Sequence, residues 1–354
     1  MKNSSKSIKP NTKTSLITYI ILIVAFVVVQ IMLATGSMSY MMQDLLVPLC
    51  VYAILAVSLN LTVGILGELS LGQAGFMCIG AYSGALFSNL METAIPEAIV
   101  RFPIALLLGG VCAAIFGILI GIPVLRLRGD YLAIVTLAFG EIIKNICASI
   151  YLGKDANGFQ TSLKSVSDMN MANDGEMLIN GALGINGTPH DSNFVIAFII
   201  LFVTVIISYN FVNSRTGRAV MSIRDNKIAA ESIGINITKY KLITFALTAF
   251  LAGVAGVIYS HNFSTLQASK FDYNTSILVL VFVVLGGIGS IRGSVIAAVV
   301  LTLIPELLRD TIVGDYRMLF YAIILISMML FTSNKTLKDK FVGIFSKKKK
   351  GEVK

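Results

Sequence analysis

Ten long, nearly uncharged hydrophobic segments dominate this sequence of 354 residues. An α-helix that crosses the hydrocarbon core of a bilayer takes roughly 20 residues, and most of the segments are about that long. Only 13% of the residues are charged, against about 25% in ordinary soluble domains. We therefore predict an all-α, polytopic integral membrane protein of about ten transmembrane helices with broken or glycine-rich segments. The predicted spans are 16–34, 45–63, 71–90, 102–122, 131–151, 194–212, 242–260, 273–288, 294–308 and 316–332.

The positive charges predict which side of the membrane each connecting segment faces. Lys and Arg gather in the tail 1–15, the loop 213–241 and the tail 333–354, and such segments stay in the cytoplasm. Both tails and the loop are therefore predicted to be cytoplasmic, which requires an even number of crossings in the membrane domain 16–332. The acidic loop 153–191 is predicted to be external, as an ordered cap or a mobile loop. A net charge of +9 placed in this way indicates a lipid environment and no nucleic acid partner.

The first hydrophobic segment could also begin a cleaved signal peptide, because four lysines precede it. Its 19 uncharged residues exceed the roughly 7–15 residues of a signal peptide's apolar region. We predict a retained helix.

No catalytic or metal-binding pattern is present in the sequence. The four cysteines lie far apart in apolar segments without CxxC spacing, so they predict neither a zinc site nor a disulfide framework. His190 and His261 are isolated near the predicted external loops, and HExxH and GxSxG are absent. We predict no metal, no cofactor bound by this chain and no enzymatic activity.

Two glycine clusters interrupt the hydrophobic pattern. The first runs from Gly64 to Gly75, with Glu68, Ser70 and Gln73 among the glycines. Irregular backbone survives within a membrane only where protein or a water-filled cavity surrounds it. The cluster therefore predicts either a broken helix that lines a solute pathway or a short cytoplasmic turn with close helix packing.

The second cluster, from Gly286 to Gly293, follows an apolar segment. It lacks the Gly-x-x-x-x-Gly-Lys-Ser/Thr pattern of a phosphate-binding loop. We predict a helix-packing turn there.

The loop 213–241 carries the signals of a short helix. Asp225 or Asn226 can cap it and Gly234 can end it, while Ala229 and Ala230 give it a small, close-packing face. A structured loop of this kind suits docking against a cytoplasmic partner, and the alternative is a solvated connector.

Glu141 and Lys144 lie three residues apart inside the fifth predicted span, on one face of a helix. Each charge costs about 2.5–3.5 kcal/mol to insert into a membrane. The two residues either pair with each other in a structural role or line a pathway, and the sequence leaves both interpretations open.

Four motifs, in the right order, resemble branched-chain amino-acid ABC transporter permeases of the LivM type. The run 125–144, LRLRGDYLAIVTLAFGEIIK, looks like the signature of that family. The segment 64–82 contains SLGQAGF and resembles the family's Ser-Leu-Gly-His-Ala segment, with Gln73 in place of the usual His. The loop 217–240 and the glycine cluster 286–293 are similar to later family motifs.

The resemblance implies a permease of the bacterial plasma membrane that imports Leu, Ile and Val by alternating access. It implies a second, related permease, two cytoplasmic ATPase subunits that bind and hydrolyse ATP, and an external solute-binding protein. Relatives in the family move urea, amides or other amino acids, so these substrates stay alternatives. A self-contained secondary transporter or channel, with Glu141 as a proton or cation site, is the main rival, and an intramembrane enzyme is disfavoured.

The motifs also assign residues. The predicted ATPase-coupling residues are Gly217, Arg218, Arg224, Asp225, Asn226, Ala229, Ala230, Glu231 and Gly234. The predicted residues of the translocation path are Gly67, Ser70, Gly72, Gln73, Tyr82, Glu141, Gly286 and Gly287.

Overall fold

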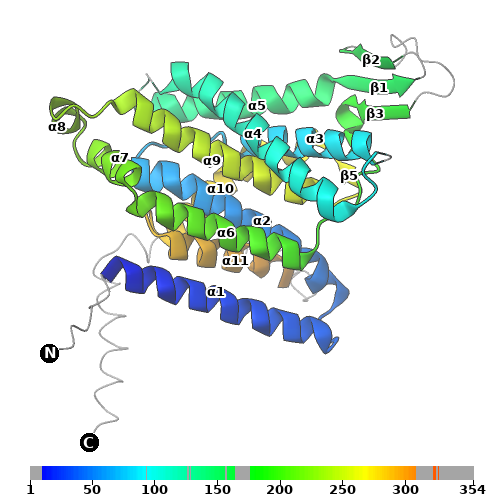
Figure 1. Ribbon diagram of the computed structural model, residues 1–354, viewed down its shortest axis with the longest axis horizontal. Coiled ribbons are helices and arrows are strands. Elements are labelled where there is room, and N and C mark those ends of the chain that lie inside the picture. Colours follow the sequence, from blue (N-terminus) through cyan, green and yellow to red (C-terminus); the bar gives the residue numbers. More distant parts are fainter. Residues whose placement is uncertain are drawn as a thin grey trace, which may run out of the picture.

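The computed structural model of the protein describes residues 10–92, 94–125, 127, 129–155, 158–163, 176–307, 322, 323 and 326. Long helices running roughly side by side make up most of this part of the chain (Figure 1). Their bounds are α1 (Pro10–Ala34), α2 (Tyr40–Asn60), α3 (Gln73–Met91), α4 (Ala98–Val124), α5 (Asp130–Ser149), α6 (Phe194–Asn213), α9 (Ile237–Ser260), α10 (Tyr273–Gly286) and α11 (Ile291–Leu307).

Eight helices of the described residues are long and apolar enough to cross a membrane. They correspond to the first eight predicted spans, and the 17-residue α11 corresponds to the ninth. The tenth predicted span, 316–332, lies outside the described residues apart from three positions, as do residues 1–9 and the tail 333–354. The prediction of a polytopic, all-α membrane protein is confirmed.

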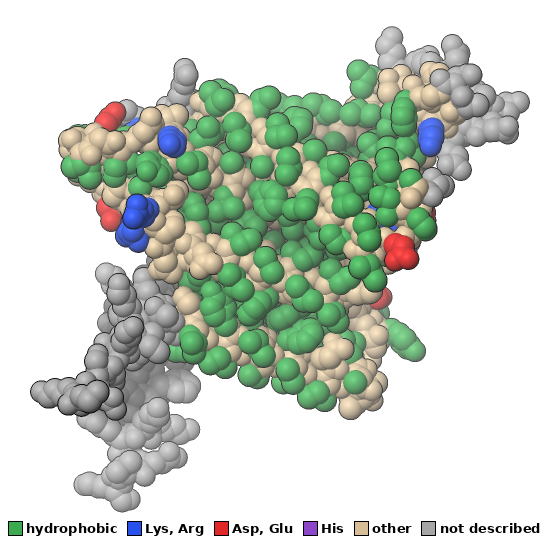
Figure 2. Space-filling view, in the orientation of Figure 1, with side chains coloured by type: hydrophobic (Ala, Val, Ile, Leu, Met, Phe, Trp, Pro, Cys, Tyr) green, Lys and Arg blue, Asp and Glu red, His purple; other side chains and the backbone are tan. Residues whose placement is uncertain are grey.

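The connecting segments gather at two opposite ends of the bundle (Figure 1). One end carries the short helices α7 (Arg215–Asp225) and α8 (Lys227–Ser232), and we call it the α7–α8 end. The start of α5 shares a cavity with α8 there, and Ser15 of α1 shares another with the end of α6. The described part of the tail 1–15 and the loop 213–241, both predicted to be cytoplasmic, therefore lie at the same end. Figure 2 shows hydrophobic side chains across the middle of the visible face and Lys and Arg toward its ends.

The opposite end, which we call the sheet end, carries short strands that the sequence did not predict. β1 (Tyr151–Asp155) pairs antiparallel with both β2 (Gly158–Ser162) and β3 (Glu176–Asn180), in the order β2-β1-β3. β4 (Ile185–Asn186) pairs with β5 (Thr265–Leu266). Of the two interpretations of the loop 153–191, the described residues therefore support an ordered cap.

The core of the bundle forms where α2, α3, α4 and α9 meet. Nearly all of α2 from Leu46 to Asn60 is buried, so this helix is surrounded by protein. Glycines let α3 and α9 approach closely: a Cβ added to Gly80 would lie 2.2 Å from the carbonyl oxygen of Gly253, and one added to Gly256 2.0 Å from that of Met77. The hydrophobic effect does not drive helices together within lipid. Small residues at such crossings allow the close van der Waals packing that does.

Gly256→Ala is expected to destabilise the fold, because the new methyl group would meet the backbone of α3, which can yield only by moving a helix. Overpacking of this kind costs about 1–3 kcal/mol. Thermal unfolding of the purified protein in detergent measures the loss as a lower midpoint.

Gly140→Ala is the matched control, since its Cβ would meet nothing closer than 3.7 Å and alanine favours a helix over glycine. Equal midpoints for the two variants would contradict the close approach of α3 and α9.

Candidate coupling and translocation sites

The segment between α6 and α9 folds into two short helices with defined caps. Ser214 Oγ accepts a hydrogen bond from the backbone N–H of Gly217 at the start of α7 (3.1 Å). Asn226 Oδ1 accepts one from the N–H of Ala229 at the start of α8 (3.0 Å). After α8, Gly234 adopts a φ of +84°, which favours glycine at a helix end. The prediction of a capped helix that ends at Gly234 is confirmed, with Asn226 as its cap.

The two faces of this segment differ in kind. Ile223, Ala230 and Ile237 are buried against one another, so the small side chain of Ala230 serves internal packing. Ile228 and Ile233 are 81% and 74% exposed. Ile228 lies on α8 and Ile233 directly after it, so two large apolar side chains stand exposed on a polar segment. The sequence analysis did not single them out, although isoleucines in a polar loop were a usable signal.

The predicted coupling residues divide between these faces. Gly217 is buried and leaves no room for a side chain, since a Cβ there would lie 2.2 Å from the carbonyl oxygen of Phe211. Arg218 is exposed and donates to the carbonyl oxygen of Asn213 (2.8 Å). The other exposed members are Arg224, Asp225, Asn226, Ala229, Glu231 and Gly234.

Arg224 connects the α7–α8 segment to the bundle. Its Nη1 donates a hydrogen bond to the carbonyl oxygen of Gly64 (2.8 Å), and its Cγ lies so close to Gly67 that a Cβ on that glycine would sit 2.5 Å away. Its guanidinium also pairs with the exposed carboxylate of Asp225 (3.2 Å). A displacement of α7 would therefore act directly on the π-helical turn, Leu61–Leu66, that follows α2.

The α2–α3 connection is the broken segment that the glycines predict. α2 continues into a π-helical turn, Leu61–Leu66, which ends at Gly67 with a φ of +79°. The chain is then non-helical until Gln73. Ser70, Gly72 and Gln73 are buried in protein, so in this structure the segment is a turn with close helix packing.

Side chains of other helices bind the backbone and side chains of this segment. The N–H of Leu71 donates to Thr136 Oγ1 of α5 (2.9 Å) and that of Ala74 to Ser276 Oγ of α10 (3.0 Å). Thr62 shares a hydrogen bond with Thr248 of α9 (2.9 Å). Glu68 forms an ion pair with Lys241 of α9. The broken segment is thus bonded to α5, α7, α9 and α10.

The α10–α11 turn also contacts the end of α2. Gly287 and Gly289 have φ values of +95° and +85°, and the N–H of Gly289 donates to the buried Asn60 Oδ1 (2.8 Å). Asn60 Nδ2 donates in turn to Ser294 of α11 (2.9 Å). Gly286 packs against α11, since its Cβ would lie 2.4 Å from the carbonyl carbon of Gly293. The predicted helix-packing turn is confirmed.

Glu141 and Lys144 form an ion pair on α5. The second carboxylate oxygen of Glu141 accepts a hydrogen bond from the N–H of Tyr273 (2.9 Å), the first residue of α10. The side chains of Glu141 and Lys144 are 26% and 20% exposed. At 1.5 Å per residue, Glu141 lies about 17 Å along the roughly 30 Å of α5, so charged atoms reach the bundle surface at mid-depth.

Two charged residues near the sheet end are buried around a histidine. Arg101 and Asp191 form an ion pair with their closest atoms 2.8 Å apart, although their side chains are only 5% and 8% exposed. His261 is fully buried, and its Nδ1 lies 2.9 Å from the carbonyl oxygen of Val257. That contact fixes the proton on Nδ1, so Ser88 donates its hydroxyl to Nε2 (2.7 Å). The prediction that His261 is isolated was wrong.

Comparisons with known proteins give the family. Residues 41–329 match the family described as branched-chain amino acid transport system / permease component. The chain belongs to this family. The predicted resemblance is thereby confirmed, and the four motifs that carried it all lie within the matched residues.

Individual relatives support the same assignment. The chain is 33% identical over 289 residues to the high-affinity branched-chain amino acid transport system permease protein LivM of Salmonella typhimurium, and 32% identical over 289 residues to that of Escherichia coli. Each match covers 79% of this chain and 66% of the relative. A fructose import permease protein of Bifidobacterium longum is 24% identical over 269 residues, 73% of this chain and 72% of its own. No solved structure matches.

The stability of the protein is expected to fall as the pH drops below about 6.5, the usual pKa of histidine. Burial lowers the pKa of His261, so the unfolded chain takes up a proton at a pH where the folded chain stays neutral. Thermal midpoints at pH 7.5 and pH 5.5 measure the loss, which His261→Gln should reduce.

His190→Gln is the matched control, because His190 is exposed and bonds only to Ser264 among the described residues. A pH dependence that disappears in the His190 variant and persists in the His261 variant would contradict this assignment.

Proposed function

We propose that this chain is a permease subunit of an ATP-binding-cassette importer and forms the translocation path for Leu, Ile and Val across the bacterial plasma membrane. Membership of the permease-component family supports the importer class, and the printed names of the two LivM relatives support the substrate. The chain acts as a transport subunit, while ATP is bound and hydrolysed on partner subunits.

The observation that carries this proposal is the α7–α8 segment, which combines an exposed outer surface with a firm anchor. Ile228 and Ile233 are exposed, and Arg224 bonds the same segment to Gly64 in the π-helical turn after α2. A partner that binds α8 and displaces it would therefore move the α2–α3 connection. Thr136 and Ser276 would pass this movement to α5 and α10.

The family supports the proposed partners, and the geometry supports where they dock. Two cytoplasmic ATPase subunits dock on the α7–α8 ends of this chain and of a second, related permease. An external solute-binding protein delivers the substrate at the sheet end. The basic loop 213–241 supports a cytoplasmic position for the α7–α8 end, and both chain termini are proposed to be cytoplasmic.

The proposed path runs along the α5–α10 face, between the two permeases. Glu141, Lys144, Asn145, Asp272 and Asn274 place partly or fully exposed polar groups there. Polar side chains at mid-depth are unfavourable against lipid and typical of a solute pathway. Opening alternates between the two ends as the broken segment follows α7.

The proposed function is tested by uptake into proteoliposomes that contain the complete transporter. Leucine uptake that requires ATP, both ATPase subunits and the binding protein is the expected result. Uptake by this chain alone, without ATP, would establish the secondary transporter instead. Competition by fructose, ribose or urea would reassign the substrate and leave the importer class intact.

Ile228→Ser is expected to weaken binding of the ATPase subunits by roughly 10- to 150-fold, because burying an isoleucine side chain contributes about 1.5–3 kcal/mol. Titration of the purified permease with its ATPase measures the affinity. Ile99→Ser is the matched control, since Ile99 is similarly exposed (83%) but begins α4 at the sheet end. Labelling of a cysteine at position 228 from the outer face of cells would contradict the docking role.

Glu141→Gln is expected to lower ATP-driven leucine uptake by roughly tenfold, because a hydrogen bond to a charged group contributes about 1.5–3 kcal/mol. Uptake per folded transporter is the measurement, with the thermal midpoint recorded beside it. Glu97→Gln, an exposed glutamate before α4, is the control. A lower midpoint with unchanged uptake would make the Glu141–Lys144 pair purely structural.

A further inference from the structure

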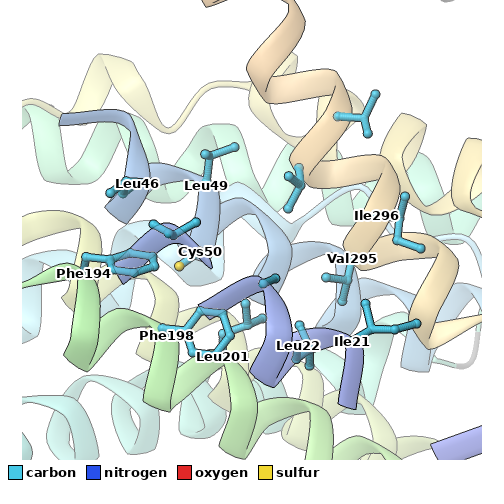
Figure 3. Close-up of a pocket in the computed structure, with 14 residues that line it drawn as sticks. Ile21, Leu22, Leu46, Leu49, Cys50, Phe194, Phe198, Leu201, Val295 and Ile296 are labelled. Atoms are coloured by element: carbon cyan, nitrogen blue, oxygen red, sulfur yellow. The ribbon is translucent and has the colours of Figure 1, made fainter. Parts of the chain in front are cut away.

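Two cavities in the described part of the bundle differ in the chemistry of their walls. One lies between α1, α2, α6 and α11, and the side chains that line it are apolar (Figure 3). The other lies at the α7–α8 end, has a volume of about 630 Å³ and is lined by charges of both signs. We call it the charged cavity. Its walls can hold a polar ligand, which those of the apolar cavity cannot.

Four segments far apart in the sequence form the walls of the charged cavity. They are the α2–α3 connection, the start of α5, the helix α8 and the start of α9. The start of α5 belongs to the run 125–144, which resembles the family signature and whose first residues have no part in the proposed coupling. A ligand in the charged cavity would therefore touch both α8 and the segments that α8 is proposed to move.

The charged groups of this cavity comprise one ion pair and three groups outside it. Glu68 pairs with Lys241, and their side chains are 18% and 7% exposed. The second carboxylate oxygen of Glu68 is buried and has no hydrogen-bond partner among the described residues. Asp130, Lys227 and Glu231 are exposed and belong to none of the ion pairs found among the described residues. The cavity thus offers two carboxylates and one ammonium group beside a pair of opposite charges.

Three aliphatic side chains line the same cavity. Leu132 is buried, Leu69 is 37% exposed and Ile228 is 81% exposed. An α-amino acid carries an ammonium and a carboxylate group on one carbon, so its site needs both signs of charge close together. An aliphatic side chain on that carbon needs an apolar surface beside them. The charged cavity has both, and its volume falls among the roughly 300–1,000 Å³ of small-molecule pockets.

Other occupants match these walls less well. Among the described residues, no group of three or more His, Cys, Asp and Glu side chains is placed to hold a metal ion. A basic side chain of a partner protein would leave Lys227 without a counter-charge, and an acidic one would do the same to Asp130 and Glu231. A zwitterion supplies both signs from one molecule.

We propose that the charged cavity is a regulatory site, at which a free zwitterionic amino acid with an aliphatic side chain binds and inhibits transport. Its ammonium group lies against Glu68 and Asp130, and its carboxylate on Lys227. Its side chain packs against Leu132 and Ile228. This inference rests on the proposed function, because the importer releases such molecules on the cytoplasmic side, where the α7–α8 end is proposed to lie.

The bound amino acid opposes the movement that drives transport. A ligand shifts an equilibrium between two conformations only when it binds one of them more tightly. Here the groups that bind it belong to α5 and α8, so a displacement of α8 would separate them and weaken binding. The bound ligand therefore holds α8 against α5, and the movement of the ATPase subunits no longer reaches the α2–α3 connection. Accumulated product thereby slows its own import.

ATP hydrolysis by the complete transporter in lipid nanodiscs tests this proposal, because both faces of the membrane are accessible there. Leucine-loaded binding protein is expected to stimulate hydrolysis. Free leucine, added beyond saturation of the binding protein, is expected to reduce the stimulated rate. Leucinol lacks the carboxylate and 4-methylpentanoate lacks the ammonium group, so neither should inhibit at the concentration at which leucine halves the rate.

Variants of the charged cavity locate the effect. Asp130→Asn and Lys227→Gln are each expected to raise the free leucine concentration for half-inhibition by roughly 10- to 150-fold, the range that corresponds to the loss of a hydrogen bond to a charged group. Each rate is compared with that variant's own rate at low free leucine. Glu97→Gln is the matched control, since Glu97 is an exposed glutamate before α4 at the sheet end, and it should inhibit like the unaltered chain.

Several outcomes would overturn the proposal. Absence of inhibition by free leucine would remove the regulatory site, and equal inhibition by leucinol or 4-methylpentanoate would remove the requirement for a zwitterion. Inhibition unchanged in both cavity variants would place it elsewhere. Weaker ATPase binding in Asp130→Asn, with leucine inhibition unchanged, would show that a partner side chain enters the cavity.

Failure of the proposed function gives a different result. Leucine-loaded binding protein would then not stimulate hydrolysis even at low free leucine. Binding of radiolabelled leucine to the purified full-length chain would still test the charged cavity, with weaker binding in Asp130→Asn and unchanged binding in Glu97→Gln as the expected result. Equal binding in both variants would contradict the site.

Discussion

The hydrogen bonds at the break between α2 and α3 are the constraint on which the rest of the bundle depends. A backbone N–H without a partner costs several kcal/mol within a membrane, and here the helix stops between Leu66 and Gln73. Thr136 and Ser276 accept the N–H groups of Leu71 and Ala74. Because these acceptors belong to α5 and α10, the break holds only while both helices stay in place. It works as a joint among helices far apart in sequence.

The same segment links the helix α7 to the α10–α11 turn. Arg224 binds Gly64, and Asn60, one turn earlier on α2, binds the α10–α11 turn at Gly289. Motion received by α7 would therefore pass to α2 and α11 through short, directional hydrogen bonds. The glycine contacts between α3 and α9 are different in kind, because they join backbones without a side chain that could yield. The bundle thus contains both the hydrogen-bonded break between α2 and α3 and the close backbone packing of α3 against α9.

The sequence predicted the helices well because hydrophobic length and charge report directly on the membrane. It also predicted the caps around α8 and the glycine turn after α10. These features depend on the type of a single residue, an asparagine that caps a helix or a glycine that adopts a positive φ. It did not predict the sheet at β1–β3, since these short strands lack alternation strong enough to separate them from a polar loop. The burial of His261 against Ser88 was missed because it joins residues 173 apart, and no local pattern reports such a contact.

The length of α10 has a consequence for the membrane itself. Its 14 residues span about 21 Å, and it reaches the length of a membrane span, Ala268–Gly286, only together with the 3₁₀ turn Ala268–Lys270 and Asp272 before it. If lipid covered this side of the bundle, the bilayer would have to become thinner there or leave Asp272 in hydrocarbon, and both are unfavourable. Contact with lipid is therefore unfavourable on the α10 side of the described bundle. A neighbouring subunit that covers it would relieve the deformation and gain affinity from the membrane as well as from its own contacts.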